Sequence, residues 1–361
     1  MSNHKGNAMK SREKFLSVFV MCMLLLGTLA GCRTEPVPNG ENRDTDAPAI
    51  SDRIETTDTD TSGSTTEPIE TTDTAETTAT DAEPEPRVFD QAKQDEIIRS
   101  IQAYNDGERQ KEKIGYKAVS VKATLLFTNW IHQPGYTNAQ GGFFDGDYYY
   151  TAFTRRVDGE ETAVIGVFDR DGNYVKESQD LPIHHANAIS DMGDGTLLVT
   201  DHDPNGGRDY TILDKETLTV IKKDFFGFPM LSMDYCIETG LYAVCGTGHG
   251  EYCRILDSEK NVLLTRKIDF KSGTDPQNFC CTPNDLFAPR YTYHSASNTM
   301  QNYIYRYSWT LGLKEVYSIE IDPGIELEAL SVVNGKMYAI SSDHTNRTMA
   351  VFLLEFPEGN V

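Results

Sequence analysis

The sequence predicts an all-β fold class for the main folded part of this protein, and three observations lead to it. From Lys117 onward, runs of aromatic and β-branched residues alternate with turn signals such as Asp145-Gly146 and Asn334-Gly335. That composition is typical of consecutive β-hairpins. The pattern recurs five times along the chain. No long helical period interrupts it, which argues against folds that alternate strands with helices.

Residues 1–31 have the composition of an export signal. Basic residues precede the uncharged apolar run Phe15–Ala30, which as a helix is about 24 Å long and therefore short for a bilayer crossing. The run ends in Leu29-Ala30-Gly31-Cys32, which resembles the lipobox of bacterial lipoproteins. This resemblance implies cleavage before Cys32 and lipidation of its thiol, so that the membrane is a partner through this anchor and the location is extracytoplasmic, at the cell surface. An ordinary leader with a chance cysteine, or a transmembrane anchor, is the alternative.

The segment that follows carries much of the net charge of −22. Residues 32–90 hold 16 acidic residues against four arginines, and 12 of the 25 residues from Thr56 to Thr80 are threonine. Such a segment buries too little apolar surface to offset its ordering entropy, so residues 32–87 are expected to be a disordered tether. The acidic balance also argues against nucleic acid as a partner, because carboxylates repel phosphates.

Residues 88–110 are expected to form one amphipathic helix. Apolar residues recur at helical spacing from Ile97 to Tyr104 among polar residues, and Asp90 is a candidate N-cap. The helix should end near Asn105-Asp106-Gly107. We expect it to pack on the domain that follows or to stand above it as a collar.

Residues 117–361 are built from a unit that occurs five times. Each unit opens with a polar residue and continues through a strand, a turn, a second strand and a third strand. The first four units add a fourth strand. The openings are separated by 47, 47, 44 and 50 residues. They lie at Gln140, Asn187, Asp234, Asn278 and Glu328.

This period matches a four-stranded propeller blade, and the chain resembles β-propeller proteins in its repeat and in one missing strand. The fifth unit stops at Val361 without a fourth strand, whereas Ser120–Phe127 is a strand that precedes the first unit. If that strand is the outer strand of the last blade, the ring closes and the open edges are covered. We therefore predict a five-bladed β-propeller. A sixth, irregular blade or a β-sandwich is the alternative.

The polar openings indicate a ligand site. The inner strands of a propeller all begin at one face beside the central channel, so residues far apart in sequence converge there. A mouth of mixed donors and acceptors suits a glycan, peptide or protein ligand. The predicted ligand-binding residues are Gln140, His185, Asn187, Asp234, Gln277, Asn278 and Glu328. In the alternative, a structural envelope protein, these side chains would satisfy one another and a few channel waters.

Known catalytic motifs are absent from the sequence. It contains no Gly-x-Ser-x-Gly elbow, no His-Glu-x-x-His helix and no phosphate-binding glycine loop. Five-bladed glycosidases use paired carboxylates. Asp234 and Glu328 are therefore the candidate catalytic pair if the protein is a carbohydrate hydrolase, which is the alternative function.

No cofactor is predicted, with one open alternative. The stretch from Asp201 to Gly206 is similar to the first half of a calcium loop, which leaves calcium at Asp201 and Asp203 as that alternative. The twelfth position of the loop is not acidic, so a polar hairpin loop is the preferred interpretation.

The cysteines do not predict a complete disulfide framework. Five follow Cys32, and an odd number leaves at least one unpaired. Cys245 and Cys253 flank one short loop and are expected to lie opposite each other on adjacent strands. They are the one pair that this arrangement favours.

Overall fold

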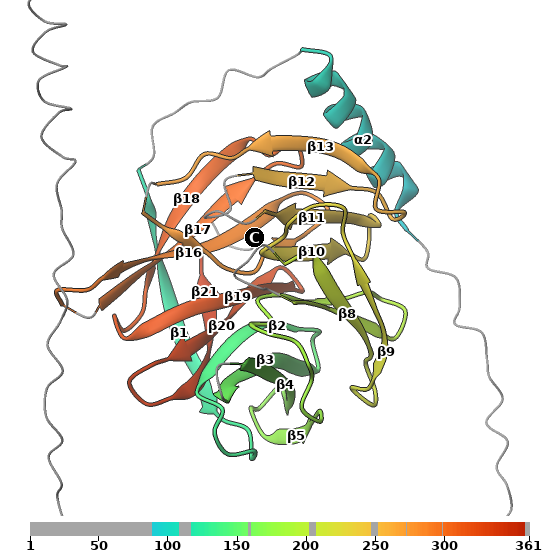
Figure 1. Ribbon diagram of the computed structural model, residues 1–361. Helices are drawn as coiled ribbons and strands as arrows, with labels where there is room; N and C mark the ends of the chain where they lie inside the picture. Colours follow the sequence, from blue (N-terminus) through green and yellow to red (C-terminus); the bar gives the residue numbers. More distant parts are fainter. Residues whose placement is uncertain are drawn as a thin grey trace, which may run out of the picture. The chain divides into compact units, whose positions relative to one another are not determined.

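The computed structural model describes residues 89–107, 117–157, 160–201, 207–246, 252–271, 273–297 and 299–357. The predicted leader, Cys32 and the tether 32–87 lie outside these residues, and so do residues 88 and 108–110 of the predicted helix. The described part lies within a compact unit, Thr78–Val361, and is mostly β with one helix (Figure 1). The predicted all-β class is confirmed for this part of the chain.

Three sheets contain four antiparallel strands each, in the order in which the strands follow along the chain. These sheets are the first three predicted repeats. The first contains β2 (Asn138–Phe144), β3 (Tyr148–Val157), β4 (Glu160–Asp169) and β5 (Tyr174–Glu177). The second contains β6 (Ile189–Asp191), β7 (Thr196–Thr200), β8 (Asp209–Asp214) and β9 (Val220–Phe225). The third contains β10 (Ser232–Cys236), β11 (Leu241–Cys245), β12 (Tyr252–Leu256) and β13 (Val262–Lys267).

The fourth and fifth repeats form one nine-stranded sheet instead of two separate ones, because β1 (Val119–Asn129) pairs with both. β1 is antiparallel to β21, which is the predicted pairing, and it is also parallel to β18. The fourth repeat contains β14 (Asp275–Pro276), β15 (Cys280–Cys281), β16 (Leu286–His294), β17 (Thr299–Tyr307) and β18 (Leu313–Glu320). The fifth contains β19 (Ile325–Val333), β20 (Lys336–Asp343) and β21 (Thr348–Glu355).

The inner strand of the fourth repeat is interrupted, which corrects the prediction of one strand that opens at Asn278. β14 and β15 both pair with β16, and Asn278 lies in the gap between them. Its backbone N–H donates 3.1 Å to the carbonyl oxygen of Glu328 on β19 and not to β16. Asn278 therefore connects the fourth repeat to the fifth.

The hydrophobic core of the described residues divides into five clusters, and each lies between two neighbouring repeats. The inner strands contact one another in the order β2, β6, β10, β15, β19 and again β2. Each cluster is represented by one buried pair: Val167 and Leu197, Leu198 and Tyr242, Ile255 and Tyr305, Ile304 and Leu327, Val351 and Phe153.

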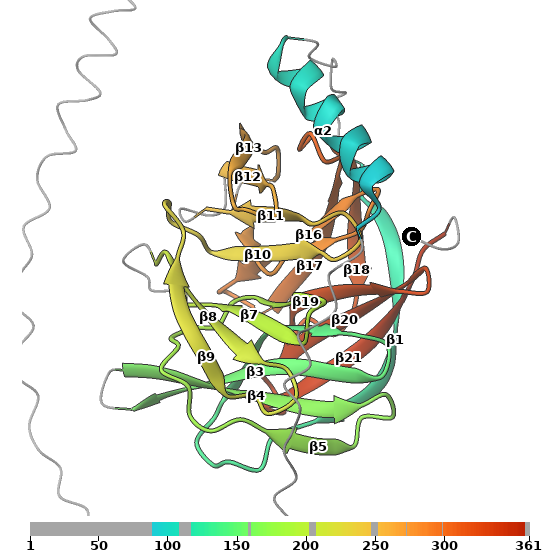
Figure 2. The same cartoon turned by 90° about the vertical axis from the view of Figure 1, so that its right-hand side faces the viewer.

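The helix α2 (Gln91–Asn105) packs on the third repeat, beside β13 (Figure 2). Asp90 caps it as predicted, since its side chain accepts from the backbone N–H of Lys93. Ile97 and Ile101 enter the core cluster between the third and fourth repeats. In the part of the chain that the structure describes, no helix is long and apolar enough to cross a membrane.

Candidate functional site

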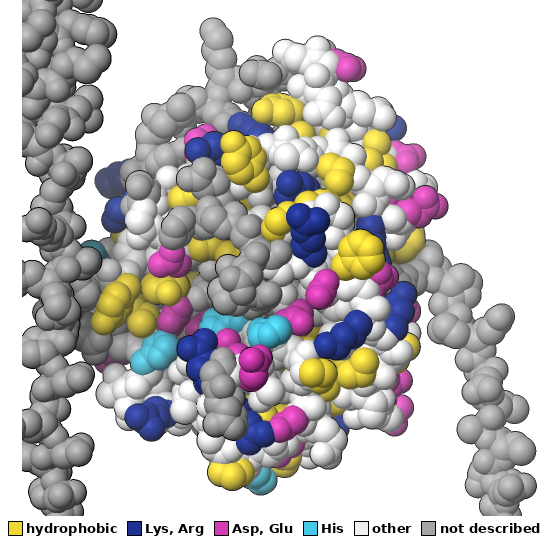
Figure 3. Space-filling view, in the orientation of Figure 1, with side chains coloured by type: hydrophobic (Ala, Val, Ile, Leu, Met, Phe, Trp, Pro, Cys, Tyr) yellow, Lys and Arg dark blue, Asp and Glu magenta, His cyan; other side chains and the backbone are white. Residues whose placement is uncertain are grey.

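The inner strands give the domain two ends with different chemistry. We call them the opening end, where Asn138, Ile189, Ser232 and Ile325 begin the strands, and the turn end, at Asp145, Met192, Ile237 and Asn334. Because a strand rises about 3.3 Å per residue, the two ends of the nine-residue β19 lie roughly 25 Å apart. The opening end faces the viewer in Figure 3, where histidine and acidic side chains gather near the middle of the face.

β-Bulges orient two predicted site residues at the opening end. The register of β19 shifts at Glu328, and that of β2 shifts between Ala139 and Gly142. A bulge leaves its extra residue outside the ladder and redirects the side chain. The bulge residues Gln140 and Glu328 are 5% and 1% exposed, and their strands contact each other.

Glu326, Glu328 and His344 form a cluster at the opening end. Both glutamates lie on β19, and the histidine lies in the turn that follows β20. Glu326 Oε2 is 2.8 Å from His344 Nε2, and Glu326 Oε1 accepts a 2.6 Å hydrogen bond from Gln277 Nε2. Polar atoms of the three clustered side chains all lie within 4.8 Å of one another. Among the described residues, neither carboxylate oxygen of Glu328 has a hydrogen-bond partner.

The electrostatics of this cluster are dominated by burial and by the proximity of two carboxyl groups. Burial, together with the negative charge of Glu326, raises the pKa of Glu328 well above its usual value. The hydrogen bond to Glu326 raises the pKa of His344. Glu328 is therefore a carboxyl group whose ionised form lacks a positively charged partner of its own.

Three other predicted residues lie near the starts of the inner strands. Asn278 is 1% exposed, and its Oδ1 atom has no hydrogen-bond partner among the described residues. His185 Nδ1 is 3.1 Å from Glu161 Oε1. Asn187 is buried, and its carbonyl oxygen lies only 2.3 Å from where a Cβ atom on Gly141 would be.

Asp234 has different surroundings from Glu328. Its Oδ1 accepts a 2.5 Å hydrogen bond from Ser190 Oγ, and its Oδ2 accepts a 2.7 Å bond from the backbone N–H of Cys281. Burial raises the pKa of Asp234 to about 7. Asp234 thus ties together the second, third and fourth repeats. The structure does not place it in the cluster that contains Glu328.

A cavity of about 320 Å³ lies at the turn end, and all five inner strands or their following turns contribute to its wall. Asp234 and Asn278 are the two predicted site residues that line it. Its apolar wall includes Phe143, Ile237 and Phe279. Its acidic wall includes Asp145, Asp191 and Glu238.

Lys215 partly neutralises this acidic wall. Its Nζ atom is 2.9 Å from Asp145 Oδ2 and 2.6 Å from Asp191 Oδ2, and it also lies over the rings of Phe143 and Tyr150. Burial alone lowers the pKa of Lys215, but the two carboxylates outweigh burial and raise it. Lys215 thus forms ion pairs with two of the acidic residues in the wall, and the three groups together keep one negative charge.

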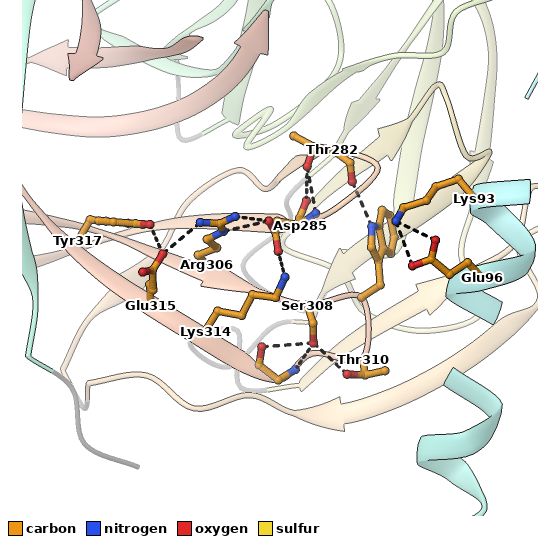
Figure 4. Close-up of polar contacts among 12 residues, drawn as sticks. Lys93, Glu96, Thr282, Asp285, Arg306, Ser308, Thr310, Lys314, Glu315 and Tyr317 are labelled. Carbon is orange, nitrogen blue, oxygen red and sulfur yellow. Dashed lines mark hydrogen bonds and ion pairs between the residues drawn. The ribbon is translucent and has the colours of Figure 1, made fainter. Parts of the chain in front are cut away.

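A second group of charged side chains lies in the fourth repeat, and its members form ion pairs with one another (Figure 4). Asp285, whose side chain is 4% exposed, accepts from Arg306 Nε at 2.9 Å and Nη2 at 2.6 Å, and it also pairs with Lys314. Arg306 continues to Glu315 at 3.1 Å. Each charge has a partner of opposite sign, and the group joins the turn before β16 to β17 and β18.

The calcium alternative stays a prediction. Asp203 lies outside the described residues. Asp201 Oδ1 accepts from the backbone N–H of His184 at 2.8 Å and is 2.6 Å from His184 Nδ1. This oxygen is thus already occupied by groups of the protein.

Cys245 and Cys253 lie directly opposite each other on β11 and β12, as predicted. Their Sγ atoms are 2.8 Å apart, and both residues are buried thiols. Burial raises the pKa of Cys253 well above its usual value. A buried thiol with a raised pKa is a poor nucleophile, so Cys253 is not a catalytic candidate.

Most residues of these sites were not predicted from the sequence, and His344 and Lys215 are two examples. Both lie in or beside turns far along the chain from their partners, and a single polar residue in a turn carries no signal of its own. One topological rule finds His344: the turn between the second and third strands of a repeat lies at the end where the inner strand begins. Asp343-His344-Thr345-Asn346 is that turn in the fifth repeat.

Comparisons with known proteins add little to this geometry. No protein-family model and no curated protein matches the chain. Hydrazine synthase of Kuenenia stuttgartiensis is 14% identical with a TM-score of 0.34, and the match covers 58% of this chain and 56% of that chain. The present chain therefore spans little more than half of that protein.

Two further solved structures are β-propeller or WD40 domains. The β-propeller domain of Cps50 (Swd1) from Myceliophteria thermophila is 10% identical, with a TM-score of 0.34 over 62% of this chain and 99% of that chain. The WD40 domain of Neurospora crassa Pan2 is 8% identical, with a TM-score of 0.36 over 66% and 97%. At these TM-scores and identities, none of the three structures supports an inference about ligand or activity.

Proposed function

We propose that this protein is a lipid-anchored, extracytoplasmic binding protein whose domain is a five-bladed β-propeller. The blade number is supported by the five core clusters between neighbouring repeats and by the order in which the inner strands contact one another. The anchor is supported by the apolar leader and by Leu29-Ala30-Gly31-Cys32. The tether would hold the domain away from the membrane surface.

The cavity at the turn end is the single observation that carries the binding function. Its volume of about 320 Å³ falls at the lower end of the range for small-molecule sites, which starts at about 300 Å³. It combines apolar and aromatic wall with a few polar groups, which is the usual composition of such sites. Because all five inner strands or their turns form it, its shape depends on the packing of the whole domain.

The wall of the cavity selects the chemistry of the ligand. Asp145, Asp191 and Glu238 outnumber Lys215, so the site repels anions and accepts neutral or cationic groups. Phe143 is a partly exposed aromatic residue of the wall that can pack on the apolar face of a sugar ring, while carboxylates accept from its hydroxyl groups. These features suit a neutral glycan. A peptide with basic side chains is the second class.

A binding experiment with a blocked cavity tests this function. Ile237 lines the cavity and is 39% exposed, so Ile237→Trp should narrow the entrance without filling the core. The matched control is Ile221→Trp on the outer strand β9, where Ile221 is 55% exposed and not part of the wall. We expect a panel of neutral glycans and basic peptides to contain a ligand for the native chain, with at least about tenfold weaker binding to Ile237→Trp alone. Equal binding to both variants would contradict the site.

The lipid anchor has its own test. Growth with a clickable fatty-acid analogue should label the native chain, and Cys32→Ala should abolish the label and release the protein from the membrane fraction. Persistent label on Cys32→Ala would remove the anchor from the proposal.

The hydrolase alternative has weaker support in this geometry. Asp234 is held by Ser190 and Cys281 beside the cavity, whereas Glu328 belongs to the cluster at the opening end. Among the described residues, no hydrogen bond joins the two carboxyl groups. Release of product from any glycan of the panel would still make the hydrolase the better proposal. A structural envelope protein would bind none of the probes.

A further inference from the structure

We propose that Glu326, Glu328 and His344 form a binding site for a first-row divalent metal cation at the opening end of the domain. The three side chains converge from β19 and from the turn after β20. None of the three residues lines the cavity, whose wall on β19 begins two residues further on at Leu330, and Asn278 lies between the two. The proposal is therefore independent of the proposed ligand and stands or falls separately.

The uncompensated carboxylate of Glu328 is the observation that points to a cation. Glu328 is 1% exposed, and neither of its oxygens has a hydrogen-bond partner among the described residues. An ionised carboxylate in such a position costs several kcal/mol unless a positive charge accompanies it. Glu326 and Glu328 are two residues apart on β19, and together with His344 they place three candidate ligand atoms within 4.8 Å of one another.

The distances between the candidate ligand atoms are compatible with metal coordination once these side chains move slightly closer together. Ligands about 2.0 Å from a tetrahedral ion lie roughly 3.3 Å from one another. Glu326 Oε2 and His344 Nε2 are already 2.8 Å apart, and the widest spacing in the group is at most 4.8 Å. A change of side-chain rotamer that moves the ligand atom of Glu328 or His344 by about 1 to 2 Å would bring all three ligand atoms to coordination distance. The side chain of His344 is 35% exposed, which gives an ion access from solvent.

Neighbouring polar groups hydrogen-bond to these candidate ligands and orient them. Gln277 Nε2 donates 2.6 Å to Glu326 Oε1 and so leaves Oε2 directed toward His344. Such outer contacts orient ligands and typically change metal affinity by about 10- to 100-fold when removed. Asn278, whose backbone binds the carbonyl of Glu328, carries a further buried oxygen without a partner among the described residues.

The donor set selects the class of metal. One imidazole and two carboxylates suit Zn²⁺, Mn²⁺ or Fe²⁺, whereas Ca²⁺ and Mg²⁺ prefer all-oxygen sites. No cysteine belongs to the group. Zn²⁺ is the appropriate probe because it is redox-inert and tolerates low coordination numbers.

Two other histidines at the same end form smaller groups. His184 pairs with Asp201, and His185 pairs with Glu161. In the described part of the chain, Glu326, Glu328 and His344 are the one group in which three ligand atoms approach this closely. These pairs therefore provide matched controls on the same face.

The test is Zn²⁺ binding to the full chain, purified in detergent and stripped with a chelator. Equilibrium dialysis with elemental analysis should find one Zn²⁺ per native chain, and saturation with Zn²⁺ at about 100 times its Kd should raise the thermal midpoint by roughly 5 °C. Glu328→Gln and His344→Ala should each weaken binding by at least about 100-fold, and Gln277→Ala by about 10-fold. Glu161→Gln and His184→Ala should bind as the native chain does.

Four results would overturn the site. They are the absence of stoichiometric Zn²⁺ binding, native affinity in Glu328→Gln, Ca²⁺ that displaces Zn²⁺ at equal concentration, and a thiolate charge-transfer band after Co²⁺ substitution. The last result would assign the metal to cysteines. Glu328→Gln keeps the shape of the side chain and removes a buried charge, so its thermal midpoint without metal should equal or exceed that of the native chain. If folded Glu328→Gln binds Zn²⁺ with native affinity, the proposed site is therefore wrong.

Discussion

The carboxyl groups of Asp234 and Glu328 are stabilised in opposite ways. Asp234 accepts hydrogen bonds from Ser190 Oγ and from the Cys281 backbone, so its oxygens are occupied by the protein. Glu328 has no such donors and lies beside Glu326. A carboxyl group that is fully hydrogen-bonded serves the fold, whereas one without donors is available to a proton or a cation.

The raised pKa of Asp234 predicts a pH dependence of stability. Well below the ordinary aspartate pKa of 3.8 this carboxyl is protonated in both the folded and the unfolded chain, and its contribution is fully present. As the pH rises toward the folded-state pKa of about 7, the unfolded chain ionises first, and the contribution is lost. Asp234→Asn mimics the neutral form and escapes this loss. We expect the stability of the native chain relative to Asp234→Asn to fall by roughly 4 kcal/mol between pH 4 and 8.

Urea unfolding at a series of pH values measures this difference. If the unfolding free energies of the two proteins keep a constant difference at every pH, Asp234 titrates normally in the folded domain. The burial and hydrogen bonds of Asp234 would then need another explanation.

At the scale of elements, β-bulges determine which side chains reach the opening end. The bulges in β2 and β19 each shift the register, and so turn Gln140 and Glu328 out of the regular alternation. The bulge in β2 also brings Gly141 against the backbone of Asn187 in the next repeat. A side chain at this position would separate the first two inner strands.

Gly141→Ala should destabilise the domain by about 2 to 3 kcal/mol. Its Cβ atom would lie 2.3 Å from the carbonyl oxygen of Asn187, and a backbone atom cannot rotate away as a side chain can. The matched control is Gly227→Ala, because a Cβ atom there meets nothing within 4 Å. Thermal unfolding of both variants checks the prediction. Equal midpoints would mean that the bulge adapts without cost.

For the whole molecule, β1 is the element that connects the two ends of the domain. It is the first strand among the described residues, yet it pairs with β21, the last of them, and with β18. Val121 on β1 is fully buried in the cluster between the fourth and fifth repeats. Without β1, the edges of both β18 and β21 would be exposed, and such edges promote aggregation.

Three shortened chains test the role of β1. Residues 89–361 contain every described element and should keep the thermal midpoint of the full chain. Residues 117–361 lack α2 and should unfold at a lower midpoint, because Ile97 and Ile101 leave the core. Residues 130–361 lack β1 as well and should lose the cooperative transition and elute as aggregates. A monomeric, cooperatively unfolding 130–361 would show that β1 is dispensable.

Much of the fold could be predicted because its signals are local. Turn residues such as Asp145-Gly146 and Asn334-Gly335 follow from backbone conformation, and apolar alternation follows from the side-chain period of a strand. These signals located the repeats, the cap at Asp90 and the opposition of Cys245 to Cys253, whereas the pairing of β1 with the last repeat followed from the resemblance to β-propeller proteins. Leader and tether composition are equally local, and they remain predictions about segments outside the described residues.

The contents of the candidate sites depended on long-range register and could not be read from the sequence. Glu328 is 16 residues from His344 and 51 from Gln277, and a shift of one residue in β19 would direct its side chain elsewhere. Asp234 and Glu328 both open a repeat, but their surroundings differ, because Asp234 contacts Ser190 and Cys281 whereas Glu328 lies beside Glu326 and His344. Local residue patterns determine the strands and their turns. Which side chains meet at either end is decided by bulges, strand pairing and packing between repeats, because these interactions join residues that the chain keeps far apart.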